Sequence, residues 1–261
     1  MSDTTLDNAR QMLLDPGGIE LRDIEHLLGQ LSGRAVDLAD LYFEHTRSES
    51  WSLEDGLVLQ IHPDGAHAID QGVGVRAVSG EKTGFAYCDE LAIPALEQAT
   101  QAVRAIGRQG QDRHVRVIPA SNTPALYAPT DPLASIPTEA KLALLKSLDE
   151  RLRAADPRVR EVMVSLTGRY SEVLIAASDG TLAGDQRPLV RLNVNVIVEQ
   201  DGRRESASYG GGGRTGYECF LTAGSAEAIA DEALRQALVN LDAENAPAGE
   251  MVVVLAPGGP G

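Results

Sequence analysis

The sequence predicts an α+β fold made of two consecutive domains, each with an antiparallel meander sheet flanked by helices. Three observations support this prediction. Apolar residues recur at helical spacing in five segments, other segments alternate apolar and polar residues, and Asp-Gly pairs separate several of the alternating segments. We also expect the first strand of a third domain near the end of the sequence.

Composition limits the classes of function. The 261 residues are 43% hydrophobic, which is enough for a substantial core, and carry a formal net charge of −15. Because the acidic residues are spread along the chain, phosphate backbones and anionic lipid surfaces would repel it, so neither nucleic acid nor a membrane is an expected partner. No segment has the roughly 18 apolar residues of a membrane helix. Two distant cysteines, Cys88 and Cys219, fit a reducing compartment, and we expect a cytoplasmic protein.

The first predicted domain covers residues 1–112. Helical spacing predicts two opening helices over 4–14 and 19–32, which Pro16-Gly17-Gly18 separates. Strand-like segments punctuated by Asp-Gly and Ser-Gly pairs follow, and they predict an antiparallel meander. A helix over 93–108 completes the domain.

The second predicted domain covers residues 113–244. A helix is expected over 138–155, because four leucines at helical spacing would line one buried face before Pro157 ends it. Alternating segments joined by Asp179-Gly180 and Asp201-Gly202 predict successive strands, because Asp-Gly is a strong hairpin signal. The expected strands and the closing helix span 161–178, 181–199, 203–209 and 225–241.

Residues 245–261 are predicted to be the beginning of a third domain. The apolar run 251–255 reads as a buried strand, and a Gly/Pro turn follows it. If the other strands of its sheet are missing, this run should leave an apolar edge exposed and favour association.

Four glycines in succession, Gly210 to Gly213, precede Arg214. Glycine lets another chain approach closely and leaves backbone groups free to pair, so Gly211, Gly212, Gly213 and Arg214 are candidate peptide-binding residues. The alternatives are a loop tip or a close packing point against another domain. Arg214 is expected to meet either a peptide carboxylate or an acidic neighbour.

No other motif in the sequence assigns a catalytic or metal-binding residue. None of the five histidines has the spacing of a metalloprotease helix, and His62 and His67 read as exposed turn residues rather than metal ligands. Gly72 and Gly74 lack the following helix of a dinucleotide-binding loop. The single tryptophan, Trp51, is expected to fill a core or an interface.

Several long motifs resemble the TldD branch of the TldD/PmbA family. They occur in order along nearly the whole chain: LYF (41–43), ESWSLEDG (49–56), DQGVGVRAVSGEKTGFAY (70–87), LYAPTDPL (126–133), SDGTLAGDQRPLVRL (178–192), GGGGRTGY (210–217) and PAGEMVVVLAPGGPG (247–261). This length and order make the resemblance specific.

The resemblance implies a cytosolic zinc metallopeptidase that degrades or processes unfolded peptides as a heterodimer with a PmbA-type (TldE) subunit. In the family, two histidines of an HExxxH helix and a later cysteine bind zinc, and the glutamate is the general base. That motif is absent from this sequence, so no catalytic or metal-binding role transfers to any residue here. We therefore expect the N-terminal portion of such a protease, inactive alone, and the sequence leaves open whether the chain is itself an enzyme.

Two other hypotheses come from the residues. One is a non-catalytic binding or scaffold subunit that pairs with a PmbA-type partner, which the glycine run and the lack of metal ligands favour. The other is a small-molecule enzyme built on a hairpin that carries His62 and His67.

Overall fold

The computed structural model describes residues 2–33, 36–54, 57–59, 66–106, 115–119, 127–244 and 248–254. Within these ranges the chain forms five α-helices and eight strands, which confirms the α+β class. The helices are α1 (Ser2–Leu13), α2 (Leu21–Leu31), α3 (Ile93–Ile106), α4 (Thr138–Ala155) and α5 (Ser225–Leu241). The strands are β1 (Leu38–Glu54), β2 (Leu57–Leu59), β3 (Ala66–Ser79), β4 (Lys82–Cys88), β5 (Ile118–Pro119), β6 (Val159–Ala177), β7 (Thr181–Gln200) and β8 (Arg203–Gly213).

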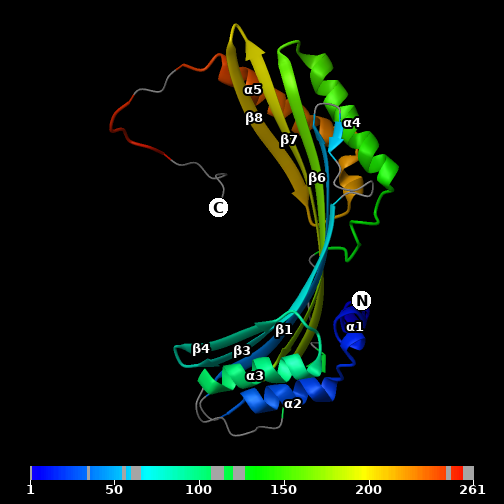
Figure 1. The fold of residues 1–261 in the computed structure, drawn as a ribbon, viewed down its shortest axis with the longest axis vertical. Coiled ribbons are helices and arrows are strands. Elements are labelled where there is room, and N and C mark those ends of the chain that lie inside the picture. The colour runs from blue at the N-terminus through cyan, green and yellow to red at the C-terminus, as the bar shows by residue number, and fades with distance from the viewer. Residues whose placement is uncertain are drawn as a thin grey trace.

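All eight strands belong to one curved sheet (Figure 1). Its main order is β4-β3-β1-β6-β7-β5, with β2 paired to β1 and β8 paired to β7. Every pairing is antiparallel except that of β5 with β7. The two expected meanders are therefore joined, because β1 pairs with β6 along nearly its whole length, from Asp40 opposite Ala177 to Glu54 opposite Met163.

The helices pack on the convex face of this crescent and leave the concave face open (Figure 1). Helices α1, α2 and α3 cover one arm, and α4 and α5 cover the other. The strand sequences dictate this arrangement. In β7, Val190, Leu192 and Val194 are buried against the helices, whereas Arg191 and Asn193 alternate with them on the opposite face.

Each arm has its own hydrophobic core. We call these the α1–α3 core and the α4/α5 core. Strand β1 contributes to both, with Leu41 and Phe43 in the α1–α3 core and Trp51 and Leu53 in the α4/α5 core. Trp51 is only 2% exposed, which confirms its expected role in a core.

Both predicted Asp-Gly hairpins are present. The β7–β8 turn has positive φ at Asp201 (52°) and Gly202 (81°), the geometry that makes Asp-Gly favourable there. At the β6–β7 turn, Gly180 has a φ of 97°, and the Asp179 carboxylate accepts a hydrogen bond from the Thr181 amide at 2.9 Å. That bond lowers the pKa of Asp179.

Two further segments differ from the sequence expectations. Strand β8 continues through the glycine run to Gly213, beyond the expected end at 209. Residues 251–254 form no strand, and Val252 is 95% exposed, because none of the described strands pairs with this segment. The predicted boundary at 112/113 and the Gly/Pro turn after 255 lie outside the described residues. Within the described ranges, no helix has the length and apolar character needed to cross a membrane.

Helix α1 docks where β7 has a glycine, and substitution there should weaken the fold. A Cβ at Gly184 would lie 2.8 Å from the Leu6 Cα and 3.1 Å from the Thr5 carbonyl oxygen, both backbone atoms of α1. We expect Gly184→Ala to lower the free energy of unfolding by about 1–3 kcal/mol, as overpacking does, in urea denaturation followed by circular dichroism.

Gly213→Ala is the matched control, because a Cβ there meets only the Thr215 methyl at 3.9 Å. Its unfolding free energy should stay within about 0.5 kcal/mol of the parent. Equal stabilities for the two variants would show that α1 does not need the glycine.

Candidate functional site

The glycine run forms the end of edge strand β8. Gly210 to Gly213 pair with residues 190–193 of β7, and among the described strands nothing pairs with the outer edge of β8. A Cβ at Gly212 would lie 2.0 Å from the Val190 carbonyl oxygen, and one at Gly211 would lie 2.9 Å from the Ile229 side chain of α5. The run is therefore a point of close packing, and it also presents a free strand edge.

Arg214 lies directly after this strand edge and contacts the first residue of a polar network. Its guanidinium lies over the Tyr127 ring, 5.3 Å from the centroid, and within the described part of the chain it has no ion-pair partner. The Tyr127 hydroxyl donates to the two Asp185 carboxylate oxygens at 3.3 and 3.5 Å. Of the two expected partners of Arg214, a peptide carboxylate or an acidic neighbour, the described residues supply no ion-pairing carboxylate, and the observed neighbour is the Tyr127 ring.

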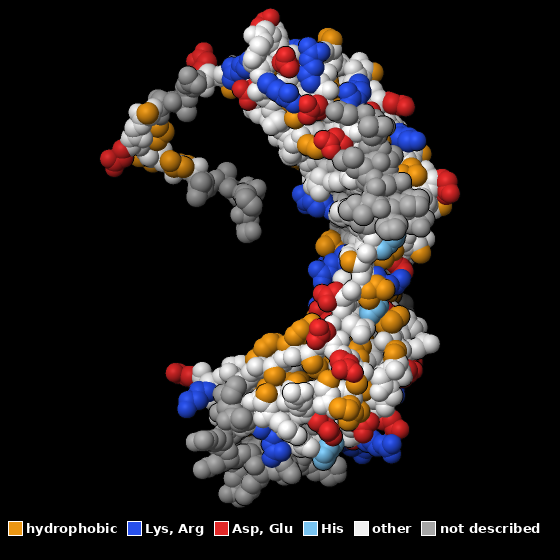
Figure 2. All heavy atoms as spheres, viewed as in Figure 1, with side chains coloured by type: hydrophobic (Ala, Val, Ile, Leu, Met, Phe, Trp, Pro, Cys, Tyr) orange, Lys and Arg blue, Asp and Glu red, His pale blue; other side chains and the backbone are white. Residues whose placement is uncertain are grey.

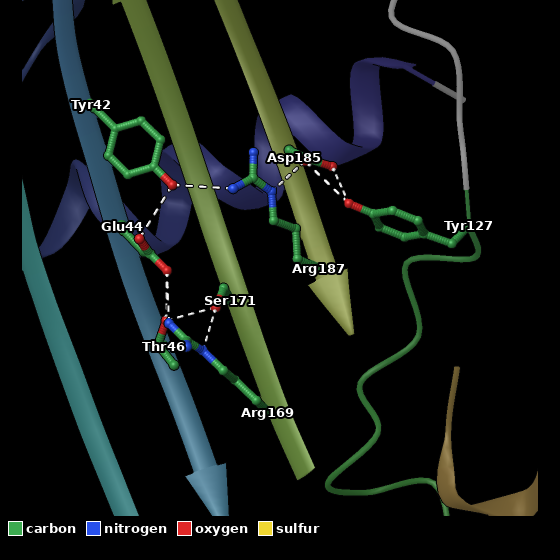
Figure 3. Close-up of polar contacts among 8 residues, drawn as sticks. All are labelled: Tyr42, Glu44, Thr46, Tyr127, Arg169, Ser171, Asp185 and Arg187. Atoms are coloured by element: carbon green, nitrogen blue, oxygen red, sulfur yellow. Dashed lines mark hydrogen bonds and ion pairs between the residues drawn. The ribbon is translucent and has the colours of Figure 1, made fainter. Parts of the chain in front are cut away.

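The network continues across the open face of the sheet (Figure 3). Asp185 on β7 accepts a hydrogen bond from Arg187 at 2.7 Å, and Arg187 donates to the Tyr42 hydroxyl on β1 at 3.2 Å. Tyr42 in turn donates to Glu44 at 3.2 Å. A chain of polar contacts therefore crosses from β7 to β1 and ends on a carboxylate.

Glu44 is the centre of a second group of contacts. Its carboxylate accepts from Thr46 at 3.0 Å and from Arg169 on β6 at 3.3 Å. Thr46 and Ser171 share a 2.7 Å hydrogen bond across the β1–β6 pair. Strands β1 and β6 thus hold the Glu44 side chain directly, and β7 contributes through the Arg187–Tyr42 hydrogen bond.

Burial and charge fix the protonation states in this network. Burial, and then the Glu44 charge, raise the pKa of Tyr42, so its phenol remains a neutral donor. For Arg187, burial acts to lower the pKa, but the hydrogen bond with Asp185 and the charges of Asp185, Tyr42 and Tyr127 together outweigh it, so the net pKa is raised. Tyr42 and Arg187 therefore present a neutral hydroxyl donor and a positive charge on this face.

A pocket of about 460 Å³ opens beside Glu44, between β1 and β4. Gly72 and Gly74 of β3 line it, and the rings of Tyr87 and Phe85 lie over them. A Cβ at Gly72 would lie 2.6 Å from the Tyr87 ring, and one at Gly74 would lie 3.1 Å from the Phe85 ring. The sequence pattern around these glycines does not fit a dinucleotide-binding loop. In the structure they make room for two aromatic rings.

A buried ion pair lies on the helix side of the sheet. Lys141 of α4 donates to Glu49 of β1 at 2.5 Å and to the Leu133 carbonyl at 2.8 Å. Both charged side chains are 4% exposed. The Lys141 ammonium also lies 5.0 Å from the Tyr217 ring centroid and 5.5 Å from that of Trp51. This pair ties α4 to the sheet at the inner end of the α4/α5 core.

Two further buried groups face each other between the cores. His45 Nδ1 lies 3.9 Å from Glu172 Oε2, and neither atom has a hydrogen-bond partner within the described part of the chain. Burial lowers the pKa of His45 and raises that of Glu172. Both groups therefore favour their uncharged forms.

The structure supports no metal site in the described residues. No group of three or more His, Cys, Asp or Glu side chains there is placed to hold a metal ion. His62 and His114 lie outside the described residues, while His67 lies 3.8 Å from Glu49. The described side chains therefore do not form a zinc centre, and we derive no catalytic step through one.

The candidates from the sequence lie at one end of this polar network, and the other members of the network were not among them. The sequence singled out the glycine run and Arg214 but not Tyr42, Glu44 or Tyr127. One signal was available, because β1 places polar residues at alternate positions opposite the apolar Leu41 and Phe43. Such alternation marks an open sheet face, but it does not reveal which strands bring their partners.

Comparisons with known proteins agree on one family. The profile described as PmbA/TldA metallopeptidase domain 1 matches residues 39–107, and that of the central domain matches residues 131–241. A metalloprotease TldD homolog from Haemophilus influenzae is 46% identical over 98% of this chain, and one from Buchnera aphidicola subsp. Schizaphis graminum is 37% identical over the same share. The chain covers 54% of each, so it spans about half the length of these relatives.

Solved structures share the fold at low sequence identity. TldE from Thermococcus kodakarensis aligns with a TM-score of 0.57 at 13% identity, over 83% of this chain and 47% of that one. A candidate modulator of DNA gyrase from Bacteroides thetaiotaomicron aligns with a TM-score of 0.63 at 15% identity, over 83% of this chain and 49% of that one. At these identities the likeness shows the fold alone.

Removing one partner of the buried ion pair should be costly. Lys141→Ala would leave the Glu49 carboxylate buried without its cation, and we expect a loss of about 3–5 kcal/mol in unfolding free energy. The double variant Lys141→Met with Glu49→Leu should recover most of this loss, because it removes both charges and keeps apolar volume. Urea denaturation measures both.

The exposed pair of Arg151 and Asp231 provides the control, with side chains 46% and 49% exposed. Arg151→Ala should cost about 1 kcal/mol or less. A loss of that size for Lys141→Ala would contradict an anchoring role for the buried pair.

The raised pKa of Glu172 predicts a pH-dependent stability. Between the ordinary value of 4.5 and the raised value, the folded state binds more protons than the unfolded state, so Glu172 costs stability as pH rises through that window. Each unit by which the pKa is raised is worth about 1.4 kcal/mol. Glu172→Gln should therefore stabilise the chain at pH 7.5.

The gain from Glu172→Gln should vanish below the ordinary pKa of 4.5, where the carboxyl is protonated in both states. Urea midpoints of parent and variant at pH 4 and 7.5 measure this. Because the pKa of His45 is lowered from its ordinary value of 6.5, His45 also makes the folded state less stable below pH 6.5. This loss is the same in parent and variant, since both keep His45, so it cancels in the difference between them. A gain of equal size at both pH values would contradict the prediction.

Proposed function

This chain belongs to the PmbA/TldD metallopeptidase family, and from that premise we propose that it is the non-catalytic, peptide-guiding portion of a TldD-type zinc metallopeptidase. Such a protease degrades or processes unfolded peptides. The observation that carries the proposal is the match to TldD homologs along 98% of the chain. The sequence contains no HExxxH motif, so we assign zinc binding and hydrolysis to residues outside these 261.

The open edge of β8 is our proposed point of peptide contact. An extended peptide there would pair with the backbone of Gly211, Gly212 and Gly213, as in strand addition. Arg214, which has an aromatic neighbour but no ion-pair partner in the described part of the chain, would donate hydrogen bonds to a peptide carboxylate. Unfolded peptides suit this mode, because strand addition needs an extended backbone rather than a folded surface.

The same proposal has three further parts. They are domain limits at 112/113 and 244/245, a PmbA-type partner in a heterodimer, and a cytoplasmic location. The two family profiles, which fall on either side of residue 113, support the division of the chain. The partner is supported by the resemblance of the sequence motifs to the TldD branch of the family.

A non-catalytic binding or scaffold subunit is the second candidate. The observation that favours it is that no metal-binding cluster exists in the described residues, while a wide sheet face is open. The two candidates differ in whether the longest product of the gene carries zinc and cuts peptides.

We expect the 261-residue chain to bind an unstructured peptide without hydrolysing it. The longest product of its gene, mixed with a PmbA-type protein, should contain zinc and cleave the same peptide. Metal analysis and mass spectrometry of the peptide measure both. Zinc and cleavage in the short chain, or neither in the long product, would contradict the proposal, and the second outcome would favour the scaffold.

Arg214→Gln should weaken binding of a peptide with a free carboxylate about 5- to 10-fold, the effect of about 1 kcal/mol from a partly exposed, charge-assisted hydrogen bond. Arg160→Gln is the control, because Arg160 is an exposed arginine of β6. This variant should bind the peptide with the affinity of the parent. Equal peptide affinities for the two variants would show that Arg214 does not bind the peptide carboxylate.

A further inference from the structure

The pocket between β1 and β4 has walls of opposite character. Tyr87 and Phe85 of β4 form the aromatic wall, and Tyr42 and Glu44 of β1 form the polar one. Figure 2 shows hydrophobic side chains beside acidic ones on the inner side of the arm that carries β3 and β4. The pocket therefore combines ring surfaces with negative charge.

The two rings have no packing role that explains their position. Phe85 is 61% exposed and Tyr87 is 59% exposed, on a face whose other side chains are mainly polar. Glycines beneath them let the rings lie against the sheet. Exposed aromatic side chains gathered at a hollow are typical of a binding surface, because leaving them in water stabilises nothing in the folded chain.

The side chains that line the pocket carry more negative than positive charges. The Asp40 carboxylate pairs with Arg76 at 2.6 Å, and that of Glu44 pairs with Arg169 at 3.3 Å. Asp70, a third carboxylate in the lining, has no hydrogen-bond or ion-pair partner within the described part of the chain.

Asp70 also lies close to the aromatic wall. It lies two positions from Gly72 on the same face of β3, and the Tyr87 ring lies over Gly72. One unpaired negative charge thus lies next to an exposed ring.

We propose that this pocket binds a basic side chain, an arginine or lysine, of a peptide lying on the concave face. The ring faces of Tyr87 and Phe85 would attract the cation, and Asp70 would pair with it. Guanidinium fits best, because it stacks flat on rings and donates to a carboxylate at the same time. The inference rests on the proposed peptide-guiding function and adds a preference for basic peptides.

Charge complementarity decides against other occupants. An acidic side chain would be repelled by the Asp70 carboxylate. No unpaired cation of the pocket would balance it, because Arg76 and Arg169 already have carboxylate partners. An apolar side chain would cover the rings but would take water from Asp70 without replacing its hydrogen bonds.

Three fluorescein-labelled peptides that differ at one central residue test the proposal. That residue is arginine, citrulline or glutamate in an otherwise Gly/Ser sequence, and citrulline has the shape of arginine without the charge. By fluorescence anisotropy with the full chain at low salt, the arginine peptide should bind at least about 5-fold tighter than the citrulline peptide. The glutamate peptide should bind weakest.

Asp70→Asn should abolish most of the preference for arginine over citrulline and leave citrulline binding unchanged. Tyr87→Leu should weaken both peptides, with circular dichroism confirming that the variant is folded. Glu81→Gln is the matched control, because it removes one negative charge from the exposed β3–β4 turn outside the pocket, and it should keep the preference.

The proposal is overturned if arginine and citrulline peptides bind equally, if none binds, or if Asp70→Asn keeps the preference. It is also overturned if sedimentation shows that the chain associates through this face, with Phe85→Ser restoring a monomer, since the pocket would then be an interface between copies. A long gene product that lacks zinc and peptidase activity would count against the proposed function alone, because the arginine preference is measured without hydrolysis.

Discussion

Strands β1, β6 and β7 run through both arms of the crescent, and the rest of the architecture depends on their continuous pairing. Each of them contributes buried residues to the α1–α3 core and to the α4/α5 core. Because side chains alternate along a strand, the same pairing that directs apolar residues to the helices presents a polar row on the other face. The concave surface with its network and pocket is therefore a direct result of how the cores are built.

The region between the two cores explains why they remain separate. On the helix side, β1 changes from Leu41 and Phe43 to His45 and Glu49 before it becomes apolar again at Trp51. Buried polar groups of this kind cost stability unless they are paired, and the structure pairs Glu49 with Lys141 while His45 and Glu172 favour their neutral forms. The centre of the sheet thus adds little to either hydrophobic core, and the residues of the two cores lie toward its two ends.

Local signals in the sequence predicted most helices and hairpins, because spacing and turn chemistry act over short distances. The helices at 138–155 and 225–241 have the expected bounds, and Asp201-Gly202 forms the expected turn. The union of two meanders into one sheet was not predictable in this way, because Thr46 and Ser171 are 125 positions apart and nothing local specifies their pairing. For the same reason, the glycine run and Arg214 could be singled out as candidates, but Tyr127 and Asp185 could not be joined to them.

The pairing of β1 with β6 also sets an order for folding during synthesis. Leu41 and Phe43 leave the ribosome early, yet their core includes Leu174, Ala176 and Leu182, which are made much later. Until then β1 has β3 on one side and an unpaired edge on the other, and such an edge is open to wrong partners. The nascent chain must therefore hold an incomplete sheet through the synthesis of α4, and the first arm closes only when its last strand arrives.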